Sequence, residues 1–256
     1  MVAAWEKLKA FFKEHSKLAL AFSGGTDSAF LLYAAVKCGA EVKAYYVKSS
    51  FQPAFELEDA RRLAGELSAP MEVIELDVLS VAQIVSNPPE RCYHCKRAIF
   101  SAITGAAERD NFSLIIDGSN ASDDPADRPG MRALKELMVR SPLRECGLTK
   151  ADVRAMSKAA GLFTHDKPAY ACLATRIPTG QAITAQKLEN IERGENYLFS
   201  LGLRDFRVRL GASGEARIQL RAEDMPKLIE KAAEVSAELG KYYKGVLLDL
   251  EVRNEQ

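Results

Sequence analysis

The sequence has no excess of charge and no long apolar run, and each absence argues against a class of protein. Lys plus Arg and Asp plus Glu each number 35, so the formal net charge is zero. Obligate nucleic-acid binders usually carry a basic excess, so we expect no nucleic-acid partner. No apolar stretch approaches the roughly 20 residues of a membrane span. The charged start MVAAWEKLKAFFKEH (1–15) is typical of an amphipathic helix rather than a signal peptide.

Cysteine is scarce, with five in 256 residues, an odd number in a chain too large to need disulfides. We therefore expect the reducing cytoplasm, where a C-x-x-C is more often metal-binding or catalytic than structural. Cys92 and Cys95, in ERCYHCKR (90–97), fit a zinc site, a disulfide, a redox pair or part of a three-thiolate site. Cys38 and Cys146 are expected to be small buried hydrophobic residues.

Short apolar runs alternate with helical patterns over the first two thirds of the chain. They predict strands at 17–23, 41–48, 71–77, 113–118 and 139–143, with helices at 27–38, 54–67, 95–110 and 149–161. This order predicts an α/β fold with a doubly wound parallel sheet.

Beyond the polar stretch 162–180 the pattern changes. It predicts a helix at 184–202, strands at 205–211 and 215–221, a helix at 223–239 and a strand at 245–253. We place a domain boundary near Gly180. The chain would then consist of a large domain, 1–180, and a small α+β domain, 181–256.

The stretch ALAFSGGTDSAFLL (19–32) has the composition of a phosphate-binding loop between a strand and a helix. It is neither a Walker A loop nor a Rossmann fingerprint, because G-x-x-x-x-G-K-[ST] and G-x-G-x-x-G are both missing. The alternative without a binding function is a glycine turn in which Asp27 caps the helix. In the phosphate-binding interpretation, the loop binds phosphate through its backbone N–H groups, its hydroxyl groups and the helix N-terminus. The residues concerned are Ser23, Gly24, Gly25, Thr26, Asp27 and Ser28.

The sequence S-G-G-T-D-S resembles the PP-loop of the ATP pyrophosphatases, whose fold is adenine nucleotide α-hydrolase-like. In that family the loop grips the pyrophosphate of ATP while a substrate oxygen attacks the α-phosphate. The resemblance implies ATP as a ligand and a catalytic role for Asp27. A carboxylate beside the phosphates makes sense only if Mg²⁺ offsets the repulsion.

Further motifs resemble the LarE family of ATP-dependent sulfur transferases: RCYHCK, DGSNASDD, DRPGMRAL, SPLRE with LTK, and KPAYACLATRIPTG. The similarity is dense from Lys17 to Gly180 and looser to about Arg253. That family adenylylates the carboxylates of pyridinium-3,5-biscarboxylic acid mononucleotide and converts them to thiocarboxylates, for the nickel-pincer nucleotide of lactate racemase. The resemblance also implies nucleotide contacts at Gly118 and Ser119, a homo-oligomer, and contact with the nickel-inserting enzyme as a further option.

Members of this family supply sulfur in two ways. Some sacrifice one cysteine, at the position of Cys172, and others use three cysteines to hold a [4Fe–4S] cluster that carries an extra sulfide. Cys92, Cys95 and Cys172 match the second kind, with Cys172 catalytic. The alternatives are a zinc site that includes His94 or His165, a transient Cys92–Cys95 disulfide, and a sacrificial Cys172.

Planar guanidinium groups suit phosphate and carboxylate groups, so we expect Arg176, Arg207 and Arg209 to hold the substrate's anions. For the two strand residues, a solvated sheet face is an equal alternative. Glu195 is a weaker candidate for the substrate site. Family members commonly have serine where Thr175 stands, which keeps a hydroxyl. The loop residues Asp123, Asp124 and Arg128 follow a strand's carboxyl end, where ligands of open α/β sheets bind.

Two other functions stay open at this point. A PP-loop tRNA thiolase can also use three cysteines, but it needs an RNA-binding surface, which a neutral chain does not favour. A non-catalytic ATP-binding sensor would bind ATP without releasing pyrophosphate.

Overall fold

The computed structural model describes residues 2–123 and 129–253. Its residues form two compact units, the first of residues up to 78 with 90–167, and the second of 79–89 with 168 onward. The predicted boundary near Gly180 lies inside the second unit, because the segment from Pro168 packs on elements of that unit. The domain division into 1–180 and 181–256 stays a prediction. Across the described ranges, no helix is both long and apolar enough to span a bilayer.

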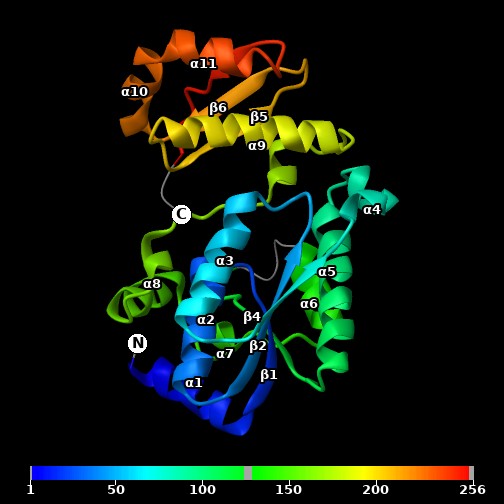
Figure 1. Cartoon of the computed structure of the whole chain (residues 1–256), viewed down its shortest axis with the longest axis vertical. Helices are drawn as coiled ribbons and strands as arrows, with labels where there is room; N and C mark the ends of the chain where they lie inside the picture. Colours follow the sequence, from blue (N-terminus) through cyan, green and yellow to red (C-terminus); the bar gives the residue numbers. More distant parts are fainter. Residues whose placement is uncertain (1, 124–128, 254–256) are drawn as a thin grey trace. The chain divides into compact units, whose positions relative to one another are not determined.

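The first unit is built on a four-stranded parallel sheet in the order β3-β2-β1-β4. Figure 1 labels β1, β2 and β4 of this sheet. The strands are β1 (Lys17–Ala21), β2 (Glu41–Lys48), β3 (Met71–Glu75) and β4 (Ile115–Asp117). One face packs on α1 (Val2–Glu14), α2 (Thr26–Lys37), α3 (Ala54–Glu66), α7 (Pro142–Glu145) and α8 (Lys150–Ala159). The other face packs on α5 (Arg91–Arg109) and α6 (Pro129–Glu136). The predicted doubly wound parallel sheet is confirmed.

Strand β2 shows how the sequence gives the sheet two apolar faces. Val42, Ala44 and Tyr46 are buried in the cluster under α2 and α3, while Tyr45 and Val47 are buried in the cluster under α5. Successive side chains of a strand point to opposite faces, so a sheet covered by helices on both sides needs a continuous apolar run. The sequence AYYV provides that run.

Two predicted elements of the first unit differ in the structure. The strand predicted at 139–143 is a single bridge between Arg140 and Ile116, followed by the helix α7. Pro142 lies at the start of this helix, where its fixed φ suits a helix and its missing N–H costs nothing. The helix predicted from Cys95 begins at Arg91, so both cysteines of the C-x-x-C lie in the first turns of α5.

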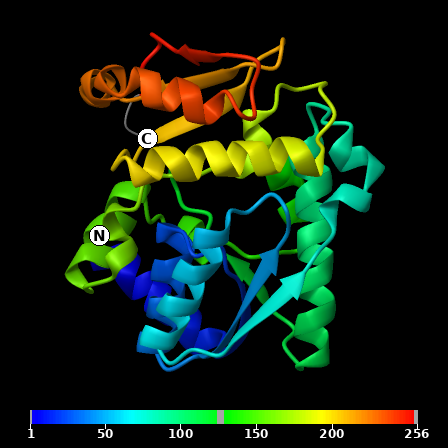
Figure 2. The ribbon, with the colours of Figure 1, turned by 45° about the horizontal axis from the view of Figure 1, so that its top comes forward.

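The second unit contains a three-stranded sheet in the order β5-β6-β7, with one face covered by helices (Figure 2). Its elements are α4 (Ala82–Val85), α9 (Ala185–Ser200), β5 (Phe206–Leu210), β6 (Ala216–Leu220), α10 (Met225–Glu230), α11 (Ala232–Leu239) and β7 (Val246–Leu248). The helix predicted at 223–239 is two helices, because the backbone at Lys231 (φ −103°, ψ 13°) leaves the helical region. The predicted small α+β unit is otherwise present.

Candidate active site

The carboxyl ends of β1 and β4 lie next to each other where the strand order of the first sheet reverses, the place where open α/β sheets bind ligands. The loops that follow these strands meet there. A Cβ atom on Gly118 would lie 2.7 Å from the backbone nitrogen of Ser28 and 3.2 Å from the carbonyl carbon of Asp27. Only glycine fits this approach, so Gly118 lies against the predicted nucleotide loop, and its contact with the nucleotide stays a prediction.

The loop 23–28 has a shape that its own side chains maintain. Gly24 has φ +71°, and a Cβ there would also lie 3.1 Å from the Glu56 carbonyl oxygen and from Ala60 Cβ. The hydroxyl groups of Ser23 and Ser28 lie 3.0 Å apart, and the N–H of Gly25 donates to Ser23 Oγ at 3.3 Å. These contacts leave the loop as a turn that leads directly into α2, the geometry of an anion-binding nest.

The three hydroxyl residues of this loop differ in exposure. Ser23 is exposed, whereas Thr26 and Ser28 are 4% and 3% exposed. Thr26 Oγ1 donates to the carbonyl oxygen of Thr164 at 2.8 Å. The buried hydroxyl groups of Thr26 and Ser28 therefore hold the loop in this conformation, and the exposed Ser23 hydroxyl is accessible to a ligand.

Asp27 does not cap its helix. The N-cap residue of α2 is Gly25, and no side chain caps the helix. The alternative in which Asp27 serves only as a helix cap is therefore wrong. Instead, Asp27 Oδ2 lies 2.6 Å from Lys150 Nζ, and Asp27 Oδ1 accepts from Asn120 Nδ2 at 3.3 Å. A half-buried carboxylate at the mouth of an anion nest is a ligand that Mg²⁺ prefers.

Two lysines that were not predicted as site residues reach this loop. Lys150 is the first residue of α8, which opens with a capping box formed by Thr149 and Asp152. Lys167 Nζ lies 2.7 Å from Asp59 Oδ2 and 3.5 Å from the carbonyl oxygen of Gly24. Lys150 lies in LTK and Lys167 in KPAYACLATRIPTG, two of the motifs that carried the family resemblance. Their place in these motifs was the sequence feature that could have identified them as site residues.

The loop after β4 is fixed by its acidic residues. Ser119 Oγ donates to Asp117 Oδ2 at 2.6 Å, and Ser141 Oγ donates to Asp117 Oδ1 at 2.6 Å. Ser119 keeps lone pairs for a ligand that donates a hydrogen bond. The carboxylate of Asp123 accepts from the N–H of Asn120 at 3.0 Å. Asp124 and Arg128 lie outside the described residues.

The three cysteines of the predicted cluster belong to both units. Cys92 and Cys95 are three residues apart on α5 of the first unit, a spacing that places two side chains on one side of a helix. Cys92 is exposed and Arg91 Nη2 lies 3.6 Å from its sulfur. Cys172 belongs to the second unit and immediately precedes the 3₁₀ turn Leu173–Arg176. All five cysteines lie in the described ranges and are thiols rather than disulfides.

Within those same ranges, no group of three or more His, Cys, Asp or Glu side chains is gathered as a metal site. The cluster ligands therefore stay a prediction, and so does the zinc alternative with His94 or His165. Cys92 and Cys95 fit a pair of thiolate ligands, because both sulfurs can serve one site from the first turns of one helix.

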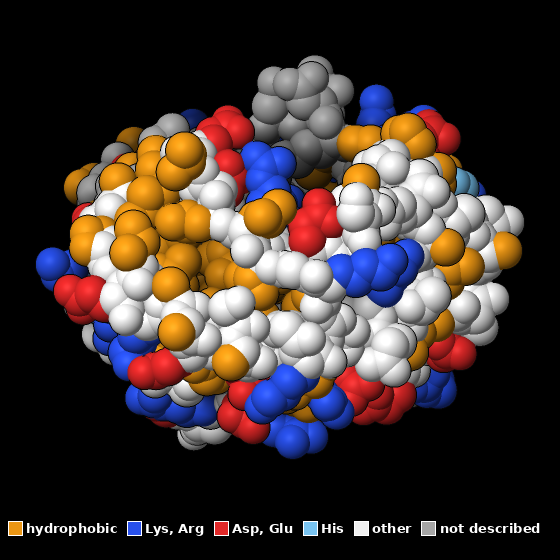
Figure 3. All heavy atoms as spheres, turned by 90° about the horizontal axis from the view of Figure 1, so that it is seen from above, with side chains coloured by type: hydrophobic (Ala, Val, Ile, Leu, Met, Phe, Trp, Pro, Cys, Tyr) orange, Lys and Arg blue, Asp and Glu red, His pale blue; other side chains and the backbone are white. Residues whose placement is uncertain are grey.

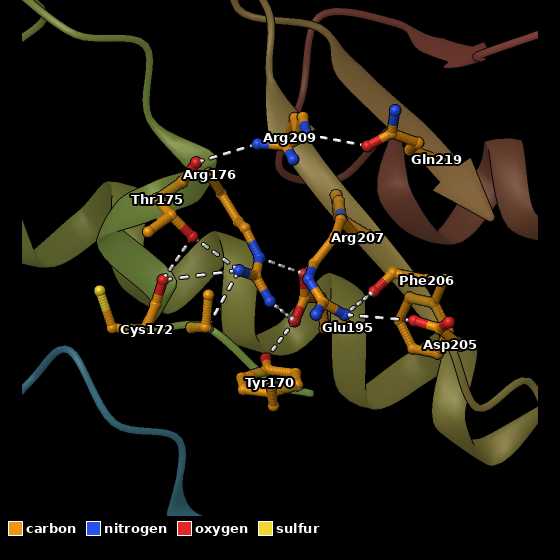
Figure 4. Close-up of polar contacts among 12 residues, drawn as sticks. Tyr170, Cys172, Thr175, Arg176, Glu195, Asp205, Phe206, Arg207, Arg209 and Gln219 are labelled. Atoms are coloured by element: carbon orange, nitrogen blue, oxygen red, sulfur yellow. Dashed lines mark hydrogen bonds and ion pairs between the residues drawn. The ribbon is translucent and has the colours of Figure 1, made fainter. Parts of the chain in front are cut away.

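Arg176 is the centre of a hydrogen-bond network that holds the turn after Cys172 (Figure 4). Its Nε lies 2.8 Å from Glu195 Oε1 and its Nη2 lies 3.2 Å from Glu195 Oε2, and both side chains are 1% exposed. Its Nη1 donates to the carbonyl oxygen of Ala171 at 3.0 Å and to Thr175 Oγ1 at 2.7 Å. Burial alone would lower the pKa of Arg176, but the charge of Glu195 outweighs it and the pKa is raised.

Glu195 has further partners in this network. Tyr170 donates its hydroxyl to Glu195 Oε2, and the N–H of Val208 donates to Glu195 Oε1 at 3.0 Å. Burial first, and then the negative charge of Glu195, raise the pKa of Tyr170. Arg176 and Glu195 thus neutralise each other's buried charge and fill each other's hydrogen-bonding groups. Their roles at the substrate site stay predictions.

Arg207 and Arg209 lie on one face of β5, as their alternation predicted, and neither lies on a solvated surface. Arg207 is 4% exposed, donates to the carbonyl oxygens of Phe206 and Ala169, and has Nη1 3.8 Å from Asp205 Oδ1. Arg209 is half-buried and donates to two neutral oxygens, Gln219 Oε1 and the Thr175 carbonyl, each at 3.1 Å.

Burial, followed by the nearby charge of Arg176, lowers the pKa of both guanidinium groups, that of Arg207 to about 10. A guanidinium that burial destabilises and whose hydrogen bonds go to neutral oxygens, as those of Arg209 do, gains from an anionic ligand. The burial of Arg207 does not fit a solvated sheet face, and the binding of substrate anions by Arg207 and Arg209 stays a prediction.

Comparison of the sequence with known proteins identifies the family of this chain. No family model matches the sequence. The chain is 34% identical over 215 residues to the pyridinium-3,5-bisthiocarboxylic acid mononucleotide synthase of Lactiplantibacillus plantarum, over 83% of this chain and 78% of that protein. It is 35% identical over 227 residues to an uncharacterized protein of Synechocystis, over 88% of this chain and 84% of that one.

A more distant relative has a different named substrate. The chain is 25% identical over 187 residues to the tRNA-specific 2-thiouridylase MnmA of Pseudothermotoga lettingae, over 59% of this chain and 54% of that enzyme. The similarity to the synthase is higher and extends over most of both chains. The chain therefore belongs to the LarE family of ATP-dependent sulfur transferases, within the PP-loop ATP pyrophosphatases.

Proposed function

We propose that this protein converts the carboxylates of pyridinium-3,5-biscarboxylic acid mononucleotide to thiocarboxylates, as a step toward the nickel-pincer nucleotide of lactate racemase. The observation that carries the proposal is the similarity to the mononucleotide synthase, at 34% identity over 83% of the chain. Arg207 and Arg209 support it, since one buried and one half-buried cation on one strand face suit a small substrate with several anionic groups. These two groups do not form the broad basic surface that RNA needs.

The first chemical step takes place at the loop 23–28. A carboxylate oxygen of the substrate attacks the α-phosphorus of ATP, and pyrophosphate leaves with the electron pair of the broken P–O bond. The backbone N–H groups of the loop and the positive end of α2 stabilise the charge that develops on the phosphates. Asp27 supplies a carboxylate for Mg²⁺, and the metal offsets the repulsion between Asp27 and the phosphates.

The second step replaces the activated oxygen by sulfur. A sulfur nucleophile attacks the carbonyl carbon of the acyl adenylate, and AMP leaves with the former carboxylate oxygen. We assign the thiols of Cys92, Cys95 and Cys172 as ligands of a [4Fe–4S] cluster, which would supply this sulfur when bound. Thr175 supports this role of Cys172, because its hydroxyl donates to the Cys172 carbonyl oxygen at 2.7 Å and fixes the turn.

The proposal also includes the cellular compartment of the enzyme and its protein partners. Five thiols without a disulfide suit a reducing cytoplasm. The second unit exposes Ile229, Leu247 and Leu250, and Figure 3 shows hydrophobic side chains gathered on part of one face. Exposed apolar surface of this kind favours association with other protein surfaces, and we assign a homo-oligomer. Contact with the nickel-inserting enzyme would pass the product on.

A comparison of three reactions tests the function. Purified protein with Mg²⁺ and ATP is given the pyridinium mononucleotide, unmodified tRNA, or no second substrate, and pyrophosphate release is measured. We expect release that depends on the mononucleotide. Release that depends on tRNA would favour the tRNA thiolase, and ATP binding without release under all three conditions would favour the sensor.

A further inference from the structure

The loop 23–28 contains one charged side chain, Asp27, and that charge is negative. ATP remains anionic even with one Mg²⁺ bound, so the loop's N–H groups alone leave part of the phosphate charge without a cation. Two lysines of the first unit contact this loop, Lys150 at the Asp27 carboxylate and Lys167 at the Gly24 carbonyl oxygen. Their ammonium groups reach the loop from α8 and from the end of the first unit.

Both lysines are held where a phosphate would meet them. Lys150 Nζ is 2.6 Å from Asp27 Oδ2, and Lys167 Nζ is 2.7 Å from Asp59 Oδ2 and 3.5 Å from the Gly24 carbonyl oxygen. Their side chains are 27% and 15% exposed, so neither cation is freely solvated. An ammonium group has three N–H donors, and a carboxylate in a small site leaves donors for further oxygens.

The helix α8 links the two lysines. Lys150 and Arg154 are four residues apart and therefore lie on one face of the helix. Arg154 donates to the carbonyl oxygen of His165 at 2.9 Å and to that of Lys167 at 3.1 Å. The helix α8 thus carries Lys150 and, through Arg154, holds the backbone at Lys167. Two unrelated surface ion pairs would not need such a link.

From these contacts we infer that Lys150 and Lys167 bind the β- and γ-phosphates of ATP. The inference rests on the proposed function, because it takes the loop 23–28 to be the ATP site. When Mg²⁺ becomes the countercharge of Asp27, Lys150 exchanges that carboxylate for a phosphate oxygen. Lys167 keeps Asp59 and adds a phosphate oxygen as a further acceptor. Arg154 is a positioning residue that holds Lys167 beside the loop.

Equilibrium binding separates this role from a structural one. The dissociation constants of Mg·ATP and of AMP are measured by calorimetry, without the second substrate, for the wild type, Lys150→Gln and Lys167→Gln. Lys158→Gln is the matched control, since Lys158 lies exposed on the same helix, α8. Loss of a charged hydrogen bond should weaken ATP binding roughly 10- to 100-fold in each loop variant. AMP binding should not change, because AMP lacks the β- and γ-phosphates, and Lys158→Gln should bind both ligands like the wild type.

Equal ATP affinity in the wild type and both loop variants would overturn the inference, and so would parallel losses of ATP and AMP affinity. Lys150→Arg retains the charge and should restore ATP binding, which provides the test if Lys150→Gln does not fold. A wild-type protein that binds no Mg·ATP would overturn the proposed function itself, a result distinct from unchanged variants.

Discussion

Arg176 and Glu195 form a two-point ion pair, 2.8 Å from Nε to Oε1 and 3.2 Å from Nη2 to Oε2, with both side chains 1% exposed. The pair joins the turn that follows Cys172 to helix α9. The remaining donors of Arg176 bind the loop's own oxygens. The position of the Cys172 turn in the second unit therefore depends on a charge pair that water does not screen.

The first prediction concerns the stability of this unit. Glu195→Ala leaves the Arg176 guanidinium buried without its countercharge, and loss of one partner of a buried pair costs about 3–5 kcal/mol. We expect the free energy of unfolding in urea to fall by that order. Glu189→Ala, on the same helix, removes an exposed pair with Arg193 and should have a far smaller effect. Similar losses in both variants would contradict the role of the buried pair.

Arg209 provides a prediction about substrate binding. Arg209→Ala removes a half-buried cation whose partners are neutral oxygens, and it should raise the KM for the mononucleotide roughly 10- to 100-fold. The KM for ATP should stay near the wild-type value, because the ATP loop belongs to the first unit. Arg217→Ala is the control, since Arg217 faces Arg209 on β6 but pairs with Asp249. Equal effects on both ligands would point to a folding defect.

Asp27 tests the nucleotide site. Asp27→Ala removes the carboxylate at the mouth of the loop, and mononucleotide-dependent pyrophosphate release should be abolished because Mg²⁺ loses its protein ligand. Glu58→Gln, an exposed position of α3 in the same unit, should release pyrophosphate at the wild-type rate. An undiminished rate in Asp27→Ala would remove the PP-loop assignment from the mechanism.

Thiol alkylation as a function of pH separates the two groups of cysteines. Burial raises the pKa of Cys38 and of Cys146. The reactive thiolate of these two therefore forms only above the ordinary thiol pKa of about 8.5, and their labelling at pH 8 should be slow. The exposed Cys92 should label first in the iron-free protein. Mass spectrometry of peptides reports each site.

The same labelling reports on the cluster. In protein reconstituted with iron and sulfide, Cys92, Cys95 and Cys172 should all be protected, because thiolates bound to iron are not available for alkylation. In urea without iron, all five cysteines should label. Rapid labelling of Cys92 in iron-loaded protein would contradict its role as a ligand.

The loop 23–28 could be predicted from sequence because its parts are contiguous. A buried strand, two glycines and a helix start follow one another, and each has a local signature. Gly118 needed the resemblance, since its close approach to Ser28 depends on which strands are neighbours in the sheet. The strand predicted at 139–143 was wrong because the apolar pattern took no account of Pro142, which starts a helix there.

The lysines at the loop show what the sequence could not predict. Lys150 is 123 residues away from Asp27 along the chain, and no local pattern marks a salt bridge of that span. The partnership of Arg176 with Glu195 was missed for the same reason, although both residues were singled out as ligand contacts. The sequence shows which residues are charged, but only packing decides whether a charge meets a ligand or another side chain.

The most direct test of sulfur transfer follows the fate of one oxygen atom. Mononucleotide labelled with ¹⁸O in its carboxylates is converted with ATP, Mg²⁺ and a sulfide source, and both the AMP and the nucleotide product are analysed by mass spectrometry. The account predicts one ¹⁸O in AMP for every sulfur gained by the product, because the carboxylate oxygen leaves on the α-phosphate. Sulfur gained with unlabelled AMP, or labelled AMP without any sulfur in the product, would contradict it.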